Sequence, residues 1–447
     1  MEFLDNLVLP QSAEHIQLLH YMLMLILFLF IPFISVVFGG TILSYLHKRK
    51  FNKEGKKEFL LFAKDTIKFL PVNSFVGLIL GVMALFTVLL ILIQLLHKSG
   101  FPTVNDLALS FFLVSFGLLF LYTYRLTFAL KLVFDSVKKD NPVIENNDDF
   151  NSYYQNASKL SGSAVKFAIV LLFLGMWIFI GALTTAIYFD AWKPASFFAT
   201  LFSAKVLLNL FTWICIAFSL TGVTLLFLFL FWKKDELQLS EEYKNFVVSV
   251  SAKLALYFSL PIPLLLFFSI SLLPDSHLSG TMFAYMLFAM ILLFLSLNFL
   301  YLLYYKKQYN YAPYLFFAFL FSVLSLVIKD QVTISNATKY HSVVLSTEYD
   351  KILAELKGEG KGEVINAAEL YQVRCGACHK FDQKLVGPAH FDVLPKYVGK
   401  EAQLIAFIRN PVKVDPAYPP MPNPGLKPAE AEAVAKYILE EFQKLKK

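Results

Sequence analysis

Cysteine is scarce in this chain, with only three among 447 residues. So few thiols exclude a disulfide-rich scaffold, and no second C-x-x-C exists to complete a zinc site of four cysteines. Two of the three nevertheless stand together, in Cys375-Gly-Ala-Cys378-His379. A C-x-x-C pair can serve as a redox dithiol, but no thioredoxin-like βαβ pattern surrounds this one. The C-x-x-C-H spacing instead indicates covalent attachment of haem c, with His379 reaching the iron.

Charged residues are also few. They make up 16% of the chain, against 57% hydrophobic residues and a mean hydropathy of +0.59. Such a chain cannot hide its apolar side chains in a soluble globule, so we expect a polytopic membrane protein. Eight apolar runs are long enough to span a membrane, at residues 17–46, 71–96, 103–133, 162–189, 197–232, 246–273, 281–304 and 312–329.

Basic residues are distributed unevenly among the connections between these runs. The odd-numbered connections are rich in lysine, whereas the alternate ones hold only Lys98 and Lys193. By the positive-inside rule the odd connections are cytoplasmic and both termini lie outside. Haem c is attached on the outer side of the bacterial inner membrane, so the C-terminal motif requires the same orientation. The net charge of +7 thus reflects topology and does not call for a nucleic-acid partner.

Ionisable side chains are missing from the middle of the spans. No histidine lies at mid-span, which argues against two b-type haems stacked across the membrane. No Asp or Glu lies there either, which argues against a proton channel. A single haem b near the outer surface stays open, because His20 begins the first span and His97 ends the second at similar depth. The alternative is that these histidines are interfacial and bind water.

Two polar residues lie in the outer half of the fifth run. Lys205 and Asn209 stand one helical turn apart. They are candidates to meet a quinone head group, a haem propionate or a lipid phosphate. The alternative is that Lys205 only extends its ammonium group to the membrane surface.

An iron bound by His379 has either a sixth ligand or an open face. His390, His341 and Met421 are the candidates for the sixth ligand. His390 follows His379 closely for a loop that must cross to the opposite haem face. Met421 stands in Tyr-Pro-Pro-Met-Pro-Asn-Pro, where the prolines stiffen the chain around one soft thioether. This rigidity favours Met421.

The C-terminal stretch resembles a class I c-type cytochrome. The shared features are, in order, a helix ending at the C-x-x-C-H motif, the Leu385-Val-Gly-Pro388 loop, a helix ending at Phe407-Ile-Arg-Asn-Pro411, the Met-Pro loop and a C-terminal helix. The resemblance implies that His379 and Met421 are the axial pair. It also implies that the carbonyl of Pro388 orients His379 through its second ring nitrogen. It covers about a fifth of the chain and leaves the membrane part unassigned.

We therefore predict an all-α protein with three parts. Residues 1–329 form a transmembrane bundle of about eight spans with both termini outside, residues 330–361 a linker, and residues 362–447 an all-α monohaem cytochrome c domain. Within the linker, residues 346–356 have the pattern of a short helix.

The expected function is electron transfer from the quinol pool, or from a membrane partner, to a periplasmic redox protein. We expect the chain to be part of a respiratory-type complex. In the alternative, the membrane part is itself an oxidoreductase that oxidises quinol or a small substrate and passes the electrons to its fused cytochrome. Membrane-bound urate oxidases are similar in layout, but no residue motif of theirs matches this chain.

Overall fold

The computed structural model describes residues 8, 10–99, 103–140, 147–188, 196–234, 239–357 and 365–446. These residues form helices and connecting turns with no strand among them, so the predicted all-α class is confirmed. The described residues divide into two compact units. The membrane unit comprises those of 20–93 and 100–337, and the C-terminal unit those of 1–19, 94–99 and 338–447.

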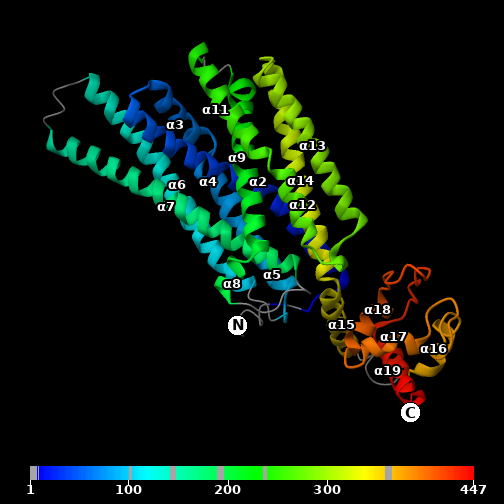
Figure 1. Ribbon diagram of the computed structural model, residues 1–447. Helices are drawn as coiled ribbons and strands as arrows, with labels where there is room; N and C mark the ends of the chain where they lie inside the picture. Colours follow the sequence, from blue (N-terminus) through cyan, green and yellow to red (C-terminus); the bar gives the residue numbers. More distant parts are fainter. Residues whose placement is uncertain are drawn as a thin grey trace. The chain divides into compact units, whose positions relative to one another are not determined.

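Among the described residues, eight helices are long and apolar enough to cross a membrane, as predicted. In chain order they are α2 (Ala13–Glu54), α4 to α5 (Ser74–Leu95), α6 (Thr103–Asp140), α7 (Asp148–Ile187), α9 with η3 (Ala204–Trp232), α11 with α12 (Glu241–Ser271), α13 (Gly280–Tyr304) and η5 with α14 (Tyr309–Ala337) (Figure 1). Their parts are α4 (Ser74–Gly77), η1 (Leu78–Met83), α5 (Ala84–Leu95), α9 (Ala204–Phe227), η3 (Leu228–Trp232), α11 (Glu241–Ser259), α12 (Ile262–Ser271), η5 (Tyr309–Tyr311) and α14 (Ala312–Ala337). Shorter helices are α3 (Lys57–Phe69), α8 (Phe197–Leu201) and η4 (Asp275–His277).

Side-chain caps define where several of these helices begin. A serine or asparagine oxygen accepts a hydrogen bond from a backbone N–H of the first turn, which satisfies one of the donors that a helix leaves open there. These caps are Asn147 for α7, Ser203 for α9, Ser240 for α11 and Ser279 for α13. The sixth span is broken between α11 and α12 at Pro261, which has no N–H to continue the α11 ladder.

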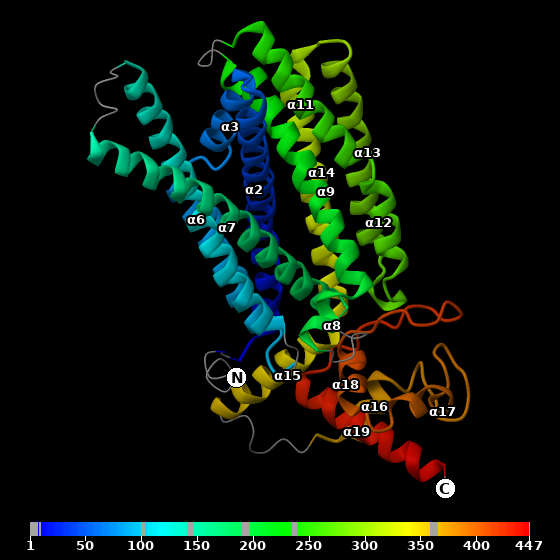
Figure 2. The same ribbon diagram turned by 60° about the vertical axis from the view of Figure 1, so that its left-hand side comes forward.

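Helices α6 and α7 lie side by side in both views (Figures 1 and 2). Glycine allows this close approach. A Cβ added to Gly117 of α6 would lie 2.9 Å from Cγ of Leu172, and one added to Gly175 of α7 would lie 2.7 Å from Cγ2 of Val114. Small residues at such contacts are typical of helix pairs in membranes, where close van der Waals packing replaces the hydrophobic effect.

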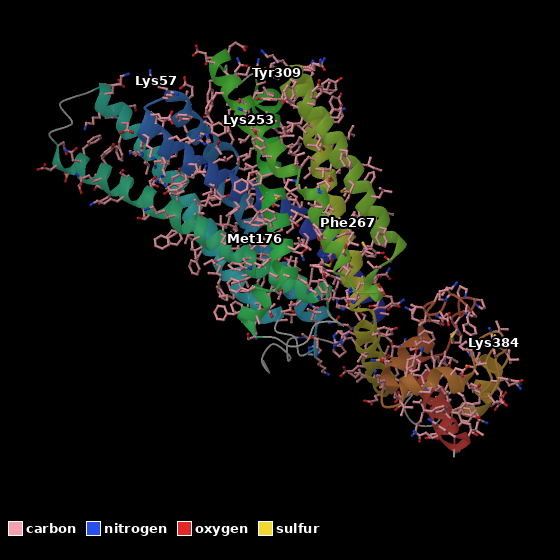
Figure 3. All side chains as sticks on the ribbon, in the orientation of Figure 1. Lys57, Met176, Lys253, Phe267, Tyr309 and Lys384 are labelled. Atoms are coloured by element: carbon pink, nitrogen blue, oxygen red, sulfur yellow. The ribbon has the colours of Figure 1, made fainter. Side chains whose placement is uncertain are left out.

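The outer faces of the spans carry apolar side chains. Phe267 of α12, for example, is 63% exposed, and Figure 3 shows it on the surface of the membrane unit. Such a surface requires an apolar solvent, which a bilayer provides. Figure 3 shows Lys57 and Tyr309 toward the same end of this unit. Lys57 belongs to the first connection between spans, and Tyr309 follows the lysines of the seventh connection.

The C-terminal unit is a small helical domain. Its helices are α15 (Lys339–Leu356), α16 (Ala367–Arg374), α17 (His390–Val393), η6 (Leu394–Tyr397), α18 (Glu401–Arg409) and α19 (Pro428–Leu445). Helix α19 packs against both α16 and α18. The core between them consists of apolar side chains from every part of the domain, including Tyr371, Leu394, Leu404, Ile408, Val434, Ile438 and Phe442.

The stretch predicted to be a linker is mostly helical. Helix α14 continues to Ala337, and α15 then covers Lys339–Leu356, so helix occupies most of residues 330–361. Tertiary contacts within the C-terminal unit hold α15. Arg409 of α18 donates to Thr347 over 2.7 Å and to Asp350 over 3.3 Å, and Lys351 pairs with Glu432 over 2.9 Å. The glycine-rich end of the predicted linker, residues 358–361, lies outside the described residues.

Candidate haem site

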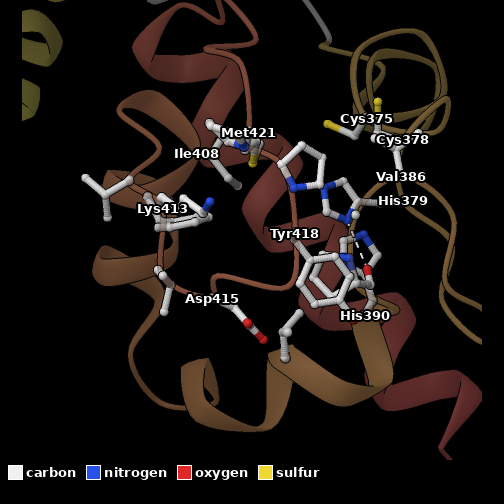
Figure 4. Close-up of a pocket in the computed structure, with 18 of the residues that line it drawn as sticks. Cys375, Cys378, His379, Val386, His390, Ile408, Lys413, Asp415, Tyr418 and Met421 are labelled. Carbon is white, nitrogen blue, oxygen red and sulfur yellow. Dashed lines mark hydrogen bonds between the residues drawn. The ribbon is translucent and has the colours of Figure 1, made fainter.

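One cavity of about 400 Å³ lies within the C-terminal unit. Its walls bring together Cys375, Cys378, His379, Pro388 and Met421, which the sequence had singled out. Figure 4 shows both cysteines, His379 and Met421 around one space, with Met421 across from His379. A cavity of this volume lies in the usual size range of cofactor sites.

The C-x-x-C-H turn is formed at the C-terminal end of α16. The N–H of Cys375 donates to the carbonyl of Tyr371 over 2.8 Å, and the N–H of His379 donates to the carbonyl of Cys375 over 3.0 Å. Burial, helped by the neighbouring Cys378, raises the pKa of the Cys375 thiol to about 11. A catalytic dithiol needs a depressed thiol pKa, so the structure favours haem attachment over redox exchange at this turn.

The imidazole of His379 is held in place by the loop that follows it. Nδ1 lies 3.1 Å from the carbonyl oxygen of Pro388. When Nδ1–H donates to this carbonyl, the lone pair of Nε2 is left for a metal. Gly387 makes room for the ring, because a Cβ there would overlap Cε1 of His379 and lie 2.8 Å from each ring nitrogen.

Met421 comes from an irregular loop between α18 and α19. Side chains shape this loop locally: Asp415 accepts from the N–H of Ala417 over 2.8 Å, and Asn423 accepts from the N–H of Gly425 over 2.9 Å. Gly425 has a φ of 66°, which glycine adopts without strain. Met421 is the last methionine of the chain and the only one after Met290, so no other thioether can reach this cavity from the C-terminal sequence.

The two histidines that competed with Met421 lie in other positions. His390 lines the cavity, but its ring stacks on that of His379 with centroids 5.1 Å apart and planes 8° apart. It therefore lies beside His379, while Met421 faces them both (Figure 4). Burial, with a smaller contribution from His379, lowers the pKa of His390 to about 4. His341 lies on α15 and is absent from the cavity wall.

The side chains of the cavity fit the group that the motif implies. The two thiols can form thioethers, the Nε2 lone pair of His379 and the sulfur of Met421 suit an iron ion, and the rest of the wall is mostly apolar, with Val386, Leu404, Phe407 and Ile438 among its members. Haem c bound here would supply a one-electron couple, whose potential depends on the axial ligands and on exclusion of water. The protein would hold it and orient the imidazole.

A small all-α domain with a C-x-x-C-H turn on an apolar cavity, and a methionine facing the histidine, defines the class of c-type cytochromes. The comparisons agree. The model of the cytochrome c family matches residues 364–441. Cytochrome c-551 of Pseudomonas denitrificans is 40% identical over 76 residues, which are 16% of this chain and 92% of that protein. Cytochrome c-551 of Pseudomonas aeruginosa is 40% identical over 68 residues, which are 14% of this chain and 65% of that protein.

Through these residues the chain belongs to the cytochrome c family, and its C-terminal domain is a class I c-type cytochrome. The domain therefore binds haem c covalently and transfers electrons, and the rest of the chain is a membrane-spanning helical region. Cytochrome c-551 of Azotobacter vinelandii is 36% identical over 75 residues, again 92% of that protein. No solved structure matches the chain.

The membrane residues singled out in the sequence fall in different surroundings. His20 belongs to the membrane unit and His97 to the C-terminal unit. Nδ1 of His20 is buried without a hydrogen-bond partner among the described residues. The ammonium of Lys205 lies 3.8 Å from the ring centroid of Tyr188. A role of His20 and His97 as haem b ligands stays a prediction.

Asn209 lines a second cavity, inside the membrane unit, whose wall Lys205 does not join. Lys329, Asp330 and Gln331 line the same cavity, and sequence reasoning missed them. It ended the eighth span at residue 329, whereas α14 continues to Ala337 and carries all three within the helix. Ile334 and Ala337 continue the apolar face of Val323 and Val327 at helical spacing, and this is the signal that could have extended the span.

Proposed function

We propose that Cys375 and Cys378 bind haem c through thioethers, that His379 and Met421 are the axial ligands of its iron, and that Pro388 orients His379. The observation that carries this proposal is the convergence of all five residues on one cavity. The 3.1 Å contact between Nδ1 of His379 and the Pro388 carbonyl supports the orienting role.

Two axial ligands leave no free coordination position on the iron. The haem then binds no substrate and exchanges single electrons, at the fairly positive potential typical of a His and Met pair. The chain is on this proposal a membrane-anchored monohaem electron carrier. Its membrane helices contact lipid and position the carrier beside its redox partners.

The chain resides in the bacterial inner membrane, with both termini and the cytochrome domain on the periplasmic side. The lysine-rich odd connections support this orientation, because positively charged connections stay in the cytoplasm. Electrons enter from the quinol pool or from a membrane partner and leave to a periplasmic redox protein. The chain serves in a respiratory-type complex. Its alternative role, an oxidoreductase with its own substrate site in the membrane part, is favoured by the second cavity.

The axial methionine can be tested by Met421→Ala in the full-length protein. Loss of the thioether opens one face of the iron, so we expect the low-spin spectrum to become high-spin and the ferrous form to bind carbon monoxide. Tyr418→Phe is the control, since it keeps an aromatic ring in the same loop. A Met421→Ala protein that stays low-spin and excludes carbon monoxide would assign the sixth position to another residue.

The electron donor can be tested on the purified protein in detergent without oxygen. We expect decylubiquinol or menadiol to reduce the haem within seconds, and the absorbance of the ferrous haem reports it. Ascorbate with a small mediator is the control, because it reduces an exposed haem without a quinol site. If ascorbate reduces the haem and neither quinol does so, electrons reach this chain from a partner protein instead.

A further inference from the structure

The second cavity, within the membrane unit, has a volume of about 120 Å³. Its wall is formed by five helices, α2, α7, α9, α12 and α14. Most of the wall is apolar, and its apolar side chains include Leu27, Phe179, Ile216, Leu266 and Val327. An apolar cavity of about 150 Å³ is large enough to hold a benzene molecule. At about 120 Å³ this space is slightly smaller, so it holds one six-membered ring if the ring's substituents extend past the partly exposed Asp330.

One part of this wall is polar and is held by hydrogen bonds between three helices. Asn209 of α9 donates from Nδ2 to Oγ1 of Thr184 on α7 over 3.1 Å. Ser269 of α12 donates to Oδ1 of Asn209 over 3.3 Å. These bonds fix the orientation of the amide, whose NH₂ group has two donors, of which one is used by Thr184.

Helix α14 adds an unsatisfied acceptor to the same wall. Gln331 is 5% exposed, and its Oε1 is buried without a hydrogen-bond partner among the described residues. Buried carbonyl oxygens are nearly always paired, because water is not available to replace the missing bond. A ligand that brings a hydroxyl group into the cavity would supply the missing donor.

Next to this acceptor lies a charged pair. Nζ of Lys329 is 2.5 Å from Oδ1 of Asp330, and the side chain of Lys329 is only 6% exposed while that of Asp330 is 45% exposed. The pair offers a buried ammonium donor and a carboxylate with access to the outside of the unit. A carboxylate so placed can take a proton from a ligand and release it.

We propose that this cavity binds the head group of a membrane quinol. A quinol hydroxyl donates to Oε1 of Gln331, Asn209 and Lys329 donate to its oxygens, and the apolar wall holds the ring. Asp330 accepts a proton during oxidation. The carboxylate of Asp330 neutralises Lys329 and would repel an anion, which argues against a lipid phosphate as the occupant.

The inference rests on the proposed function, because it assumes that quinol is the electron source. Oxidation of one quinol to quinone breaks two O–H bonds and releases two protons and two electrons. The electrons reduce two ferric c-type haems to ferrous, one electron each. One proton goes to Asp330, and the other goes to water.

Binding can be measured without haem reduction. A photoreactive azidoquinone is added to the full-length protein in detergent, with decylubiquinone as competitor, and the labelled peptides are identified by mass spectrometry. We expect label on α2, α7, α9, α12 or α14, which together line the cavity, and roughly tenfold weaker binding in Gln331→Leu, because one hydrogen bond to a buried acceptor is lost. Gln308→Leu, at an exposed glutamine, is the matched control. Label elsewhere, unchanged binding in Gln331→Leu, or displacement by anionic phospholipid instead of decylubiquinone overturns the proposal.

Reduction separates this proposal from the proposed function. At saturating decylubiquinol we expect Asp330→Asn to slow haem reduction at least about tenfold, with binding of azidoquinone retained and reduction by ascorbate unchanged. Label in the cavity without reduction by quinol would leave the site standing and overturn quinol as donor. Rapid reduction by quinol in both Asp330→Asn and Gln331→Leu would keep the donor and overturn this site.

Discussion

Gly387→Ala tests how closely the loop holds the imidazole of His379. A Cβ at position 387 would overlap Cε1 of His379 and lie 2.8 Å from both ring nitrogens, whereas real Cβ contacts essentially never fall below 3.0 Å. The ring or the loop must therefore move. Either movement weakens the contact of 3.1 Å between Nδ1 and the Pro388 carbonyl.

The magnitude follows from two contributions. Overpacking a tight contact costs about 1–3 kcal/mol, and loss of one hydrogen bond costs about 1 kcal/mol, so we expect destabilisation of about 2–4 kcal/mol. The assay is denaturant unfolding of the C-terminal domain in the full-length protein, followed by haem absorbance. A displaced imidazole should also make part of the ferric haem high-spin.

Gly399→Ala is the comparison. Gly399 has a φ of 75°, and a Cβ added there would have no atom within 4 Å, so alanine at this position strains only the backbone. We expect a loss of about 1 kcal/mol with an unchanged haem spectrum. If Gly387→Ala keeps both the stability and the spectrum of the wild type, the described contact between Gly387 and His379 does not exist in the haem-bound protein.

Two further predictions concern α15. Arg409→Met removes the hydrogen bonds of 2.7 Å to Thr347 and 3.3 Å to Asp350, so we expect thermal unfolding to show about 1–3 kcal/mol lower stability of the C-terminal unit. An unchanged unfolding temperature would mean that Arg409 does not hold α15. Burial, with a further contribution from the charge of His97, lowers the pKa of His341 below its ordinary 6.5. The native state then binds fewer protons than the unfolded state, so the stability of the C-terminal unit should fall as the pH drops below about 6.5. His341→Gln should weaken this pH dependence. Equal denaturant midpoints of wild type and variant across this pH range would contradict the prediction.

Much of the C-terminal domain could be predicted from the sequence, because covalent attachment of haem requires the two cysteines and the histidine at a fixed spacing. The C-x-x-C-H motif and the Met-Pro loop are short signals that need no tertiary information. The eight spans are also readable, since a bilayer requires long apolar runs. Span ends were harder to predict: the eighth span was predicted to end at Lys329, with Asp330 in the linker, because charged residues usually lie outside the apolar region, whereas α14 continues to Ala337.

The elements that escaped prediction depend on tertiary partners. Helix α3 has a mixed sequence, and it is held by contacts such as that of Asp65, which accepts from the hydroxyl of Tyr243 over 2.9 Å. For helix α15 the sequence predicted residues 346–356 but neither the start at Lys339 nor the contact with Arg409, which lies far away in sequence. Neither partnership leaves a local signal. Asn209 was a candidate from the sequence, but the cavity that it lines was not predictable, because four other helices complete it.

The central claim is that the iron porphyrin is bound covalently at Cys375 and Cys378. The most direct measurement is mass spectrometry of the protease-digested protein after acid extraction of all noncovalent haem. We expect the peptide that contains both cysteines to retain one haem, and the pyridine haemochrome spectrum of the intact protein to be that of two thioether bonds. Free thiols at Cys375 and Cys378, with all the porphyrin in the extract, would contradict the account.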